Sequence, residues 1–129
     1  MSCDCPLGIS LFAGRDYTAQ FTLTTSTPSP STPYDLTDAK AWLTVKEKTD
    51  TDAETLILKR NDLAGGDDTE INITDPSNGI LEVYFLPEDT NTLQDGGYWF
   101  DLVIENAAGK TIQAVAPSRF NIKYTVTKL

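Results

Sequence analysis

Apolar and polar residues alternate along most of this chain with a period of two. The alternation is clearest in residues 17–25, 98–105 and 119–126. In the first of these segments, threonine and glutamine occupy the positions between the apolar residues. A period of two indicates strands with one buried and one solvent-facing side. Threonine suits the solvent-facing side because β-branched residues favour a pleated backbone.

Shorter segments of the same character lie between these three strands and are separated by turn signals. The further strands that we predict are residues 9–12, 40–47, 55–59, 70–74, 80–86 and 110–115. The segment Asp75-Pro76-Ser77-Asn78-Gly79 is a strong turn signal. One short helical turn is predicted near 87–93, since Pro87 suits a first helical position and two acids follow it.

Eight or nine short strands without a pair of amphipathic helices favour an all-β fold. We predict an antiparallel β-sandwich, immunoglobulin-like or related, and a closed barrel is the structural alternative. A chain of 129 residues can bury one core. We therefore expect a flexible N-terminal tail over residues 1–8 and a single sandwich domain over 9–129.

A proline-rich loop is predicted at 26–38. Pro28, Pro30 and Pro33 exclude a helix or a central strand there. Loops of this length often carry function. These prolines and Tyr34 are therefore candidate partner contacts.

The charge balance limits the classes of partner. Acids outnumber bases 19 to 10, which gives a net charge of −9. Such a chain repels phosphate, so we expect no binding to nucleic acid or to an anionic membrane. We also expect no transmembrane helix, because no run of eighteen apolar residues occurs, and no secretory signal at the start.

The residue types argue against catalysis. The chain has no histidine, which removes the commonest general base, the imidazole triads and most zinc sites. Asp101 and Glu88 are candidates for a carboxylate pair, but 19 acids produce such pairs by chance. We predict no enzyme, no catalytic residue, no metal site and no cofactor.

Two weaker features stay open. Cys3 and Cys5 are either reduced thiols on a loose terminus or a metal-ligand pair completed by other copies in an oligomer. Both interpretations fit synthesis in a reducing cytoplasm. The aspartates at 50, 52, 67, 68 and 75 are interpreted as turn formers, with a structural calcium ion in a loop as the alternative.

Two tryptophans fall on the polar side of their strands. Trp42 and Trp99 lie out of phase with the predicted core residues around them. If both are exposed, they can anchor a partner or stack on a sugar. The alternative is that each caps the core or lies under the proline loop.

A series of short motifs follows in a fixed order. GRDYTAQFTLT comes first, then Asp35-Leu36-Thr37-Asp38-Ala39, ITDPSNGILEVYFLPEDTNTL, GGYWFDLVIENAAGKT and a final YTVT. In order and spacing they resemble a small β-sandwich domain of tailed-bacteriophage virion proteins, similar to the N-terminal domain of baseplate upper proteins. The departures are an inserted Arg15, Asp38 in place of a glycine, Phe100 in place of a tyrosine, and the long proline loop.

The resemblance implies a building block. The motif positions with architectural roles are Asp16, Asp35, Leu36, Asp75, Gly79, Pro87, Leu93, Tyr98 and Asp101. Leu93 is expected to be a buried peg, and Tyr98 a core residue. The implied protein is made in the host cytoplasm and works in the virion, in the tail or baseplate or as a capsid decoration (cement) protein. We expect several copies, bound to one another and to other virion proteins. The alternative is a carbohydrate-binding module that uses Trp42 and Trp99.

Overall fold

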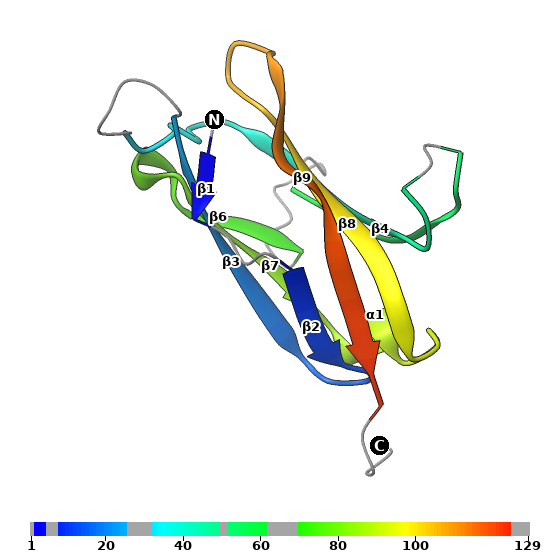
Figure 1. Cartoon of the computed structure of the whole chain (residues 1–129). Coiled ribbons are helices and arrows are strands. Elements are labelled where there is room, and N and C mark those ends of the chain that lie inside the picture. Colours follow the sequence, from blue (N-terminus) through cyan, green and yellow to red (C-terminus); the bar gives the residue numbers. More distant parts are fainter. Residues whose placement is uncertain (1, 5–7, 26–31, 50–51, 62–69, 125–129) are drawn as a thin grey trace.

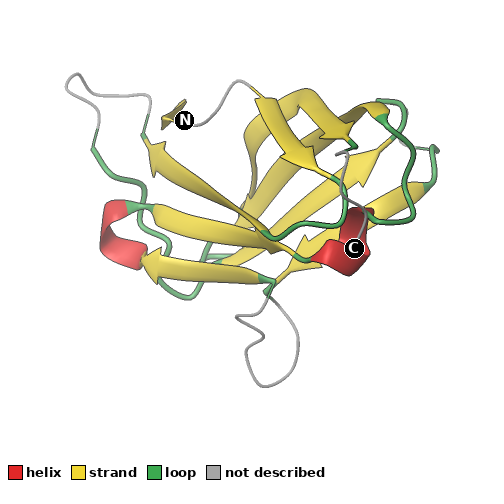
Figure 2. Ribbon diagram, turned by 90° about the horizontal axis from the view of Figure 1, so that it is seen from below, coloured by secondary structure: helices red, strands yellow, loops and turns green. Residues whose placement is uncertain are grey.

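Two sheets packed face to face make up the molecule (Figures 1 and 2). The computed structural model describes residues 2–4, 8–25, 32–49, 52–61 and 70–124. The four-stranded sheet has the order β1 (Ser2–Asp4), β3 (Tyr17–Thr24), β7 (Ile80–Phe85) and β6 (Ile71–Asp75). The five-stranded sheet has the order β2 (Gly8–Phe12), β9 (Thr111–Lys123), β8 (Gly96–Glu105), β4 (Lys40–Lys46) and β5 (Thr55–Arg60). The all-β sandwich is confirmed.

The strand order is that of an immunoglobulin-like domain. Strands β1, β3, β7 and β6 occupy the places of A, B, E and D, and β9, β8 and β4 those of G, F and C. Strand β5 extends this sheet as C′ does in variable domains. The neighbouring strands are antiparallel, with the exception of β2, which runs parallel to β9. The predicted topology is thus confirmed, and the barrel is not formed because the two sheets are separate.

Phenylalanine rings fill the centre of the sandwich. Phe21 of β3 and Phe100 of β8 lie in opposite sheets with ring centroids 6.3 Å apart. Phe120 of β9 contacts Phe100 at 6.3 Å and Phe85 of β7 at 5.4 Å. Antibody domains join strands B and F by a disulfide, whose second cysteine comes two residues after a tyrosine at the start of F. Here Tyr98 occupies that tyrosine position, so Phe100 stands where the second cysteine would be.

Tyr98 forms the hydrogen bond that is typical of the tyrosine at the start of strand F in immunoglobulin domains. It is buried, and its hydroxyl donates a 2.7 Å hydrogen bond to the backbone oxygen of Gln94. Burial is the main cause that raises the pKa of the Tyr98 phenol above its ordinary value of 10.0. The neutral, donating form is therefore the form that the folded state favours.

We expect Tyr98→Phe to destabilise the domain by about 1 kcal/mol, the usual net worth of one hydrogen bond. The same variant should lose the pH dependence of the unfolding free energy that the Tyr98 phenol contributes. Because the folded pKa is the higher one, the contribution of Tyr98 is complete below pH 10 and declines as the pH rises towards the folded value. Urea unfolding of both proteins across the alkaline range measures this. A stability difference that grows with rising pH contradicts the assignment.

The last strand corrects the predicted break at Pro117. The pattern predicts two strands, 110–115 and 119–126, whereas the structure has one strand, β9. Phe100 pairs with Ser118 and Leu102 with Val115, so Ala116 and Pro117 form a bulge opposite a single residue. Proline is tolerated at a bulge because no ladder bond needs its missing N–H.

The structure refines three smaller predictions. The flexible tail expected over 1–8 contains β1, which pairs with the end of β3, and Gly8, which begins β2. The helical turn near 87–93 is confirmed but shorter, since α1 spans Pro87–Thr90. Leu93, expected to be buried, is half-buried and packs against the core from its rim.

An ion pair between Lys59 and Asp89 lies at the end of the sandwich beside α1. Lys59 is the inward residue of β5 and is only 4% exposed. Its Nζ lies 2.6 Å from Oδ2 of Asp89, and its ammonium group lies 5.9 Å from the centre of the Phe85 ring. The same Oδ2 accepts a 2.7 Å hydrogen bond from the backbone N–H of Leu86. Asp89 thereby fixes the start of α1 and neutralises a cation inside the core.

At the opposite end, the turn after β6 packs against the loop before β4. Asp75 accepts hydrogen bonds from Ser77 and Asn78, and residues Pro76–Asn78 form a 3₁₀ turn. The backbone oxygen of Pro76 accepts a 2.9 Å bond from the N–H of the fully buried Leu36. The turn thus holds the 32–39 loop in place.

Gly79 ends this turn with a backbone φ of 71°, in the left-handed region. A Cβ there would lie 2.3 Å from the backbone oxygen of Leu23 and 2.8 Å from that of Tyr34. We expect Gly79→Ala to cost about 2–4 kcal/mol, from left-handed strain and from the forced shift of packed backbone. Gly109→Ala is the control, since its φ is also positive but its Cβ would meet only a side chain at 3.9 Å. Equal losses of stability in the two variants contradict the close approach.

The other motif acids lie at the surface. Asp35 is exposed and accepts bonds from the N–H and the hydroxyl of Thr37, at 2.9 and 2.6 Å. The hydroxyl bond and then the N–H bond lower the pKa of the Asp35 carboxyl below its ordinary value. Asp16 is exposed in the turn before β3. Asp38 adopts a positive φ of 57°, a left-handed conformation that aspartate tolerates better than most residues.

Candidate interaction surface

The outer faces of the two sheets differ in character. The four-stranded sheet turns polar side chains outward, such as the exposed Thr18, Gln20 and Thr74. The five-stranded sheet turns large apolar side chains outward. These are the half-buried Trp42, Trp99 and Val103, Leu58 at 43% exposure, and the exposed Phe12 and Pro117. Apolar groups gathered on one face indicate an interaction surface. We call the outer side of the five-stranded sheet the front face, and the outer side of the four-stranded sheet the back face.

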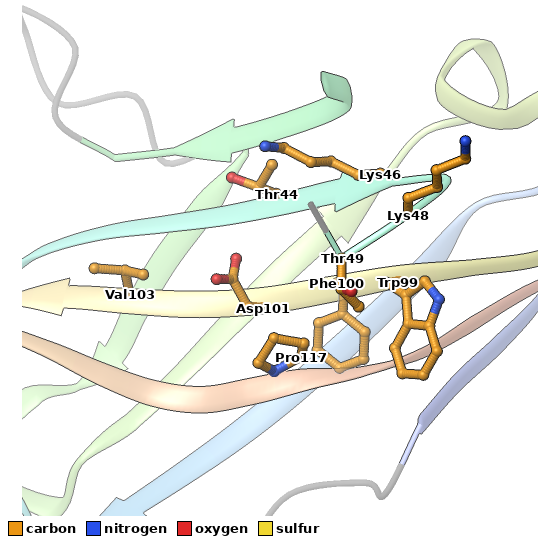
Figure 3. Close-up of a pocket in the computed structure, with 9 residues that line it drawn as sticks. All are labelled: Thr44, Lys46, Lys48, Thr49, Trp99, Phe100, Asp101, Val103 and Pro117. Carbon is orange, nitrogen blue, oxygen red and sulfur yellow. The ribbon is translucent and has the colours of Figure 1, made fainter. Parts of the chain in front are cut away.

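A hollow of about 210 Å³ lies in the front face. Figure 3 shows the residues that line it, which are Thr44, Lys46, Lys48, Thr49, Trp99, Phe100, Asp101, Val103 and Pro117. Strand β4 contributes Thr44 and Lys46, and β9 contributes Pro117 from its bulge. The bulge thus contributes one residue, Pro117, to the wall of the hollow.

An arginine stacks on one of the tryptophans. The Arg119 guanidinium carbon lies 4.8 Å from the centre of the Trp99 ring, a cation–π contact between directly paired residues of β9 and β8. A Cβ at Gly97 would lie 2.5 Å from a guanidinium nitrogen of Arg119. The small residue therefore leaves room for the arginine side chain.

Basic residues concentrate in the five-stranded sheet. Its strands contain six of the ten bases but only two of the nineteen acids. The bases are Lys40, Lys46, Lys59, Arg60, Arg119 and Lys123. The strands of the four-stranded sheet contain three acids, Asp4, Asp75 and Glu82, and no base. A chain with a net charge of −9 thus has one sheet with an excess of positive charge.

The two candidate carboxylates do not lie together. Asp101 lies in the middle of the front face, where it pairs with Thr44 of β4 and accepts a 3.0 Å bond from the amide of Gln113. Glu88 lies in α1, in the connection that follows the other sheet. Within the described ranges, no three cysteine or acidic side chains gather in a way that could hold a metal ion. No described helix is long and apolar enough to cross a membrane.

The predicted partner contacts fall into two places. Trp42 and Trp99 share the front face, but they pair with Val103 and Lys46 at opposite ends of the β4–β8 ladder. Four residues of strand separate them, about 13 Å, so they do not form one platform.

Pro33 and Tyr34 lie at the end of the sandwich that carries the 32–39 loop. Pro33 is exposed, and the Tyr34 hydroxyl accepts a 3.2 Å bond from Asn106 of the β8–β9 hairpin. Pro28 and Pro30, as well as Cys5 and the aspartates at 50, 67 and 68, lie outside the described residues.

The pattern of single strands missed three contributors to the front face, namely Leu58, Pro117 and Arg119. The alternation in 119–126 already places Arg119 opposite to the core residues. The alternation does not show that Arg119 pairs with Trp99, twenty residues earlier in the chain. This pairing of β9 with β8 places the cation beside the aromatic ring.

No protein-family model matches this sequence, and no curated protein matches it. Eighty solved chains match the structure. One is a GspB Siglec domain, with 18% identity and a TM-score of 0.48 over 96% of this chain and 57% of that one. Murine CRIg has 12% identity and a TM-score of 0.36, over 96% and 97% of the two chains. The extracellular domain of the sodium channel beta4 subunit has 11% identity and a TM-score of 0.33, over 92% of both. Identities and scores this low say nothing of what this protein binds.

Proposed function

We propose that this protein is a non-enzymatic assembly module that binds other proteins through its front face. In keeping with the motif order of the sequence, its place is the virion of a tailed bacteriophage, in the tail, the baseplate or the capsid decoration. It works there in several copies and contacts both its own copies and other virion proteins.

One observation carries this proposal, which is the contrast between the two outer faces. The front face combines two tryptophans, an exposed leucine and a stacked arginine, and Trp and Arg are the residues most enriched at energetically important interface positions. The back face of the same domain is mostly polar, with Ile80 and Tyr84 half-buried among its polar residues. If solubility alone determined the surface, polar residues would be favoured on both outer faces.

Incorporation into particles tests the front face. Leu58→Asp places a charge at an exposed apolar position of β5, and we expect it to reduce the amount of protein found in purified particles. Ala107→Asp, an equally charged change in the exposed β8–β9 hairpin, is the control and should assemble normally. If both variants are incorporated like the wild type, the front face is not the contact surface.

A carbohydrate-binding module is the second candidate, because Trp42 and Trp99 both reach the front face. Two observations weigh against it. The Arg119 guanidinium already stacks on the Trp99 ring, so a sugar would have to displace it. The two tryptophans also lie too far apart to contact one sugar ring together. A glycan array with Trp99→Ala and Trp42→Ala decides the matter: specific sugar binding that either variant abolishes favours this function over protein assembly.

A further inference from the structure

We propose that copies of this chain stack front to back, with the basic front face of one copy on the back face of the next. This inference rests on the proposed function and names one of its partners, a second copy of the chain. It follows from the distribution of charge between the two faces.

The charges make the two faces complementary. The front face presents the exposed side chains of Lys40, Arg119 and Lys123, and the two residues after β4, Glu47 and Lys48, offset each other. The acids that its strands contain are Asp101 and Glu105. The back face presents Glu82 of β7, between Gln20 of β3 and Asn72 of β6, in strands that contain no base.

Apolar side chains are also available on both faces. Trp42, Trp99 and Val103 lie between the basic positions of the front face. On the back face, Tyr84 is half-buried beside Thr18, in the row next to Glu82. A contact between the two faces would therefore bury apolar as well as charged side chains.

The charge also weighs against the symmetric alternative. A front-to-front dimer would bring together two faces that each carry more bases than acids. A front-to-back contact is heterologous, so each copy keeps one free face and the assembly grows until it closes into a ring or continues as a filament. Such growth gives the several copies that the proposed function needs.

The size of the sheet predicts a contact of modest strength. Five strands about 4.8 Å apart and about seven residues long cover roughly 550 Å² in projection. Stable interfaces bury about 800 Å² of each partner. We therefore expect association that depends on protein concentration, and that weakens with salt because charges on exposed faces are screened.

The test is sedimentation velocity of the purified chain over a range of concentrations, in about 0.02 M and about 0.5 M salt. We expect oligomers in low salt and monomer in high salt. Arg119→Glu on the front face and Glu82→Lys on the back face should each abolish the oligomers. Lys110→Glu, in the β8–β9 hairpin, and Glu54→Lys, before β5, make the same charge changes at exposed positions away from both faces and should not.

Mixing the two variants tests whether the contact is front to back. The Arg119→Glu protein keeps its back face and the Glu82→Lys protein keeps its front face, so the mixture should associate although neither variant does so alone. Circular dichroism checks that each variant is folded, and Arg119→Gln and Glu82→Gln replace any that is not.

Three results overturn the proposal: monomer under every condition, oligomers that the two variants leave unchanged, or a mixture that stays monomeric. A chain that is monomeric in solution and yet present in particles refutes the stacking alone. A chain that stacks but is absent from particles refutes the proposed function alone.

Discussion

Phe100→Ala is expected to destabilise the domain by about 3–5 kcal/mol, the usual cost of truncating a buried aromatic ring. The Phe100 side chain is 1% exposed, and its ring packs between Phe21 of the opposite sheet and Phe120 of the neighbouring strand. Domains of this kind are stable by only about 5–15 kcal/mol. The variant therefore loses a large share of its stability, which urea unfolding measures directly.

Phe12→Ala is the matched control for this prediction. Phe12 is 52% exposed at the end of β2, and we expect a change within about 0.5 kcal/mol, as is usual for surface positions. Similar losses at the two positions would mean that the Phe21–Phe100 contact does not hold the two sheets together.

Asp89→Asn is the second large expected loss, about 3 kcal/mol, the lower end of the usual cost of breaking a buried ion pair, because the lysine is buried but the Asp89 side chain is 20% exposed. Lys59 is 4% exposed and lies 2.6 Å from Asp89. The asparagine is nearly the same shape, but it leaves the ammonium group without its counter-charge in the core. Thermal and urea unfolding should both show the loss.

The neighbouring Glu88→Gln removes the same charge from an exposed position of α1 and should change the stability by less than about 0.5 kcal/mol. The double variant Lys59→Met with Asp89→Asn replaces the buried cation by an apolar chain. It should recover much of the lost stability, since a buried pair replaced as a whole costs little. A double variant as unstable as Asp89→Asn shows that the cost does not come from the unpaired lysine.

Local alternation was enough to predict most of the strands. In β8, for example, Tyr98, Phe100, Leu102 and Ile104 are all buried, because a half-buried strand encodes its own inner face. The turn at Asp75–Gly79 was equally local. It depends on hydrogen bonds from the Ser77 and Asn78 side chains to the Asp75 carboxylate and on one glycine with a positive φ.

What could not be predicted depends on pairing between distant residues. Lys59 appears as one more charge after an apolar run, and only Asp89, thirty residues later, explains its burial. Pro117 looks like a strand terminator until β8 supplies the register that makes it a bulge. Strand β1 is only three residues long, too short for a hydrophobic pattern. It is a strand because it pairs with the edge of β3.

The candidate surface divides in the same way. The position of Trp42 and Trp99 on the polar side of their strands follows from the sequence period. The contact of Arg119 with Trp99 and the hollow beside the bulge follow from the arrangement of β8 and β9. The excess of basic residues in one sheet is visible only after each strand has been assigned to its sheet.

Quantitative mass spectrometry of purified phage particles from the source genome is the most direct measurement of the proposed role. A structural module predicts that this chain is present in every preparation, at several copies relative to a capsid or tail protein of known number. Particles that are complete and infectious without a detectable trace of the chain would contradict the role in the virion.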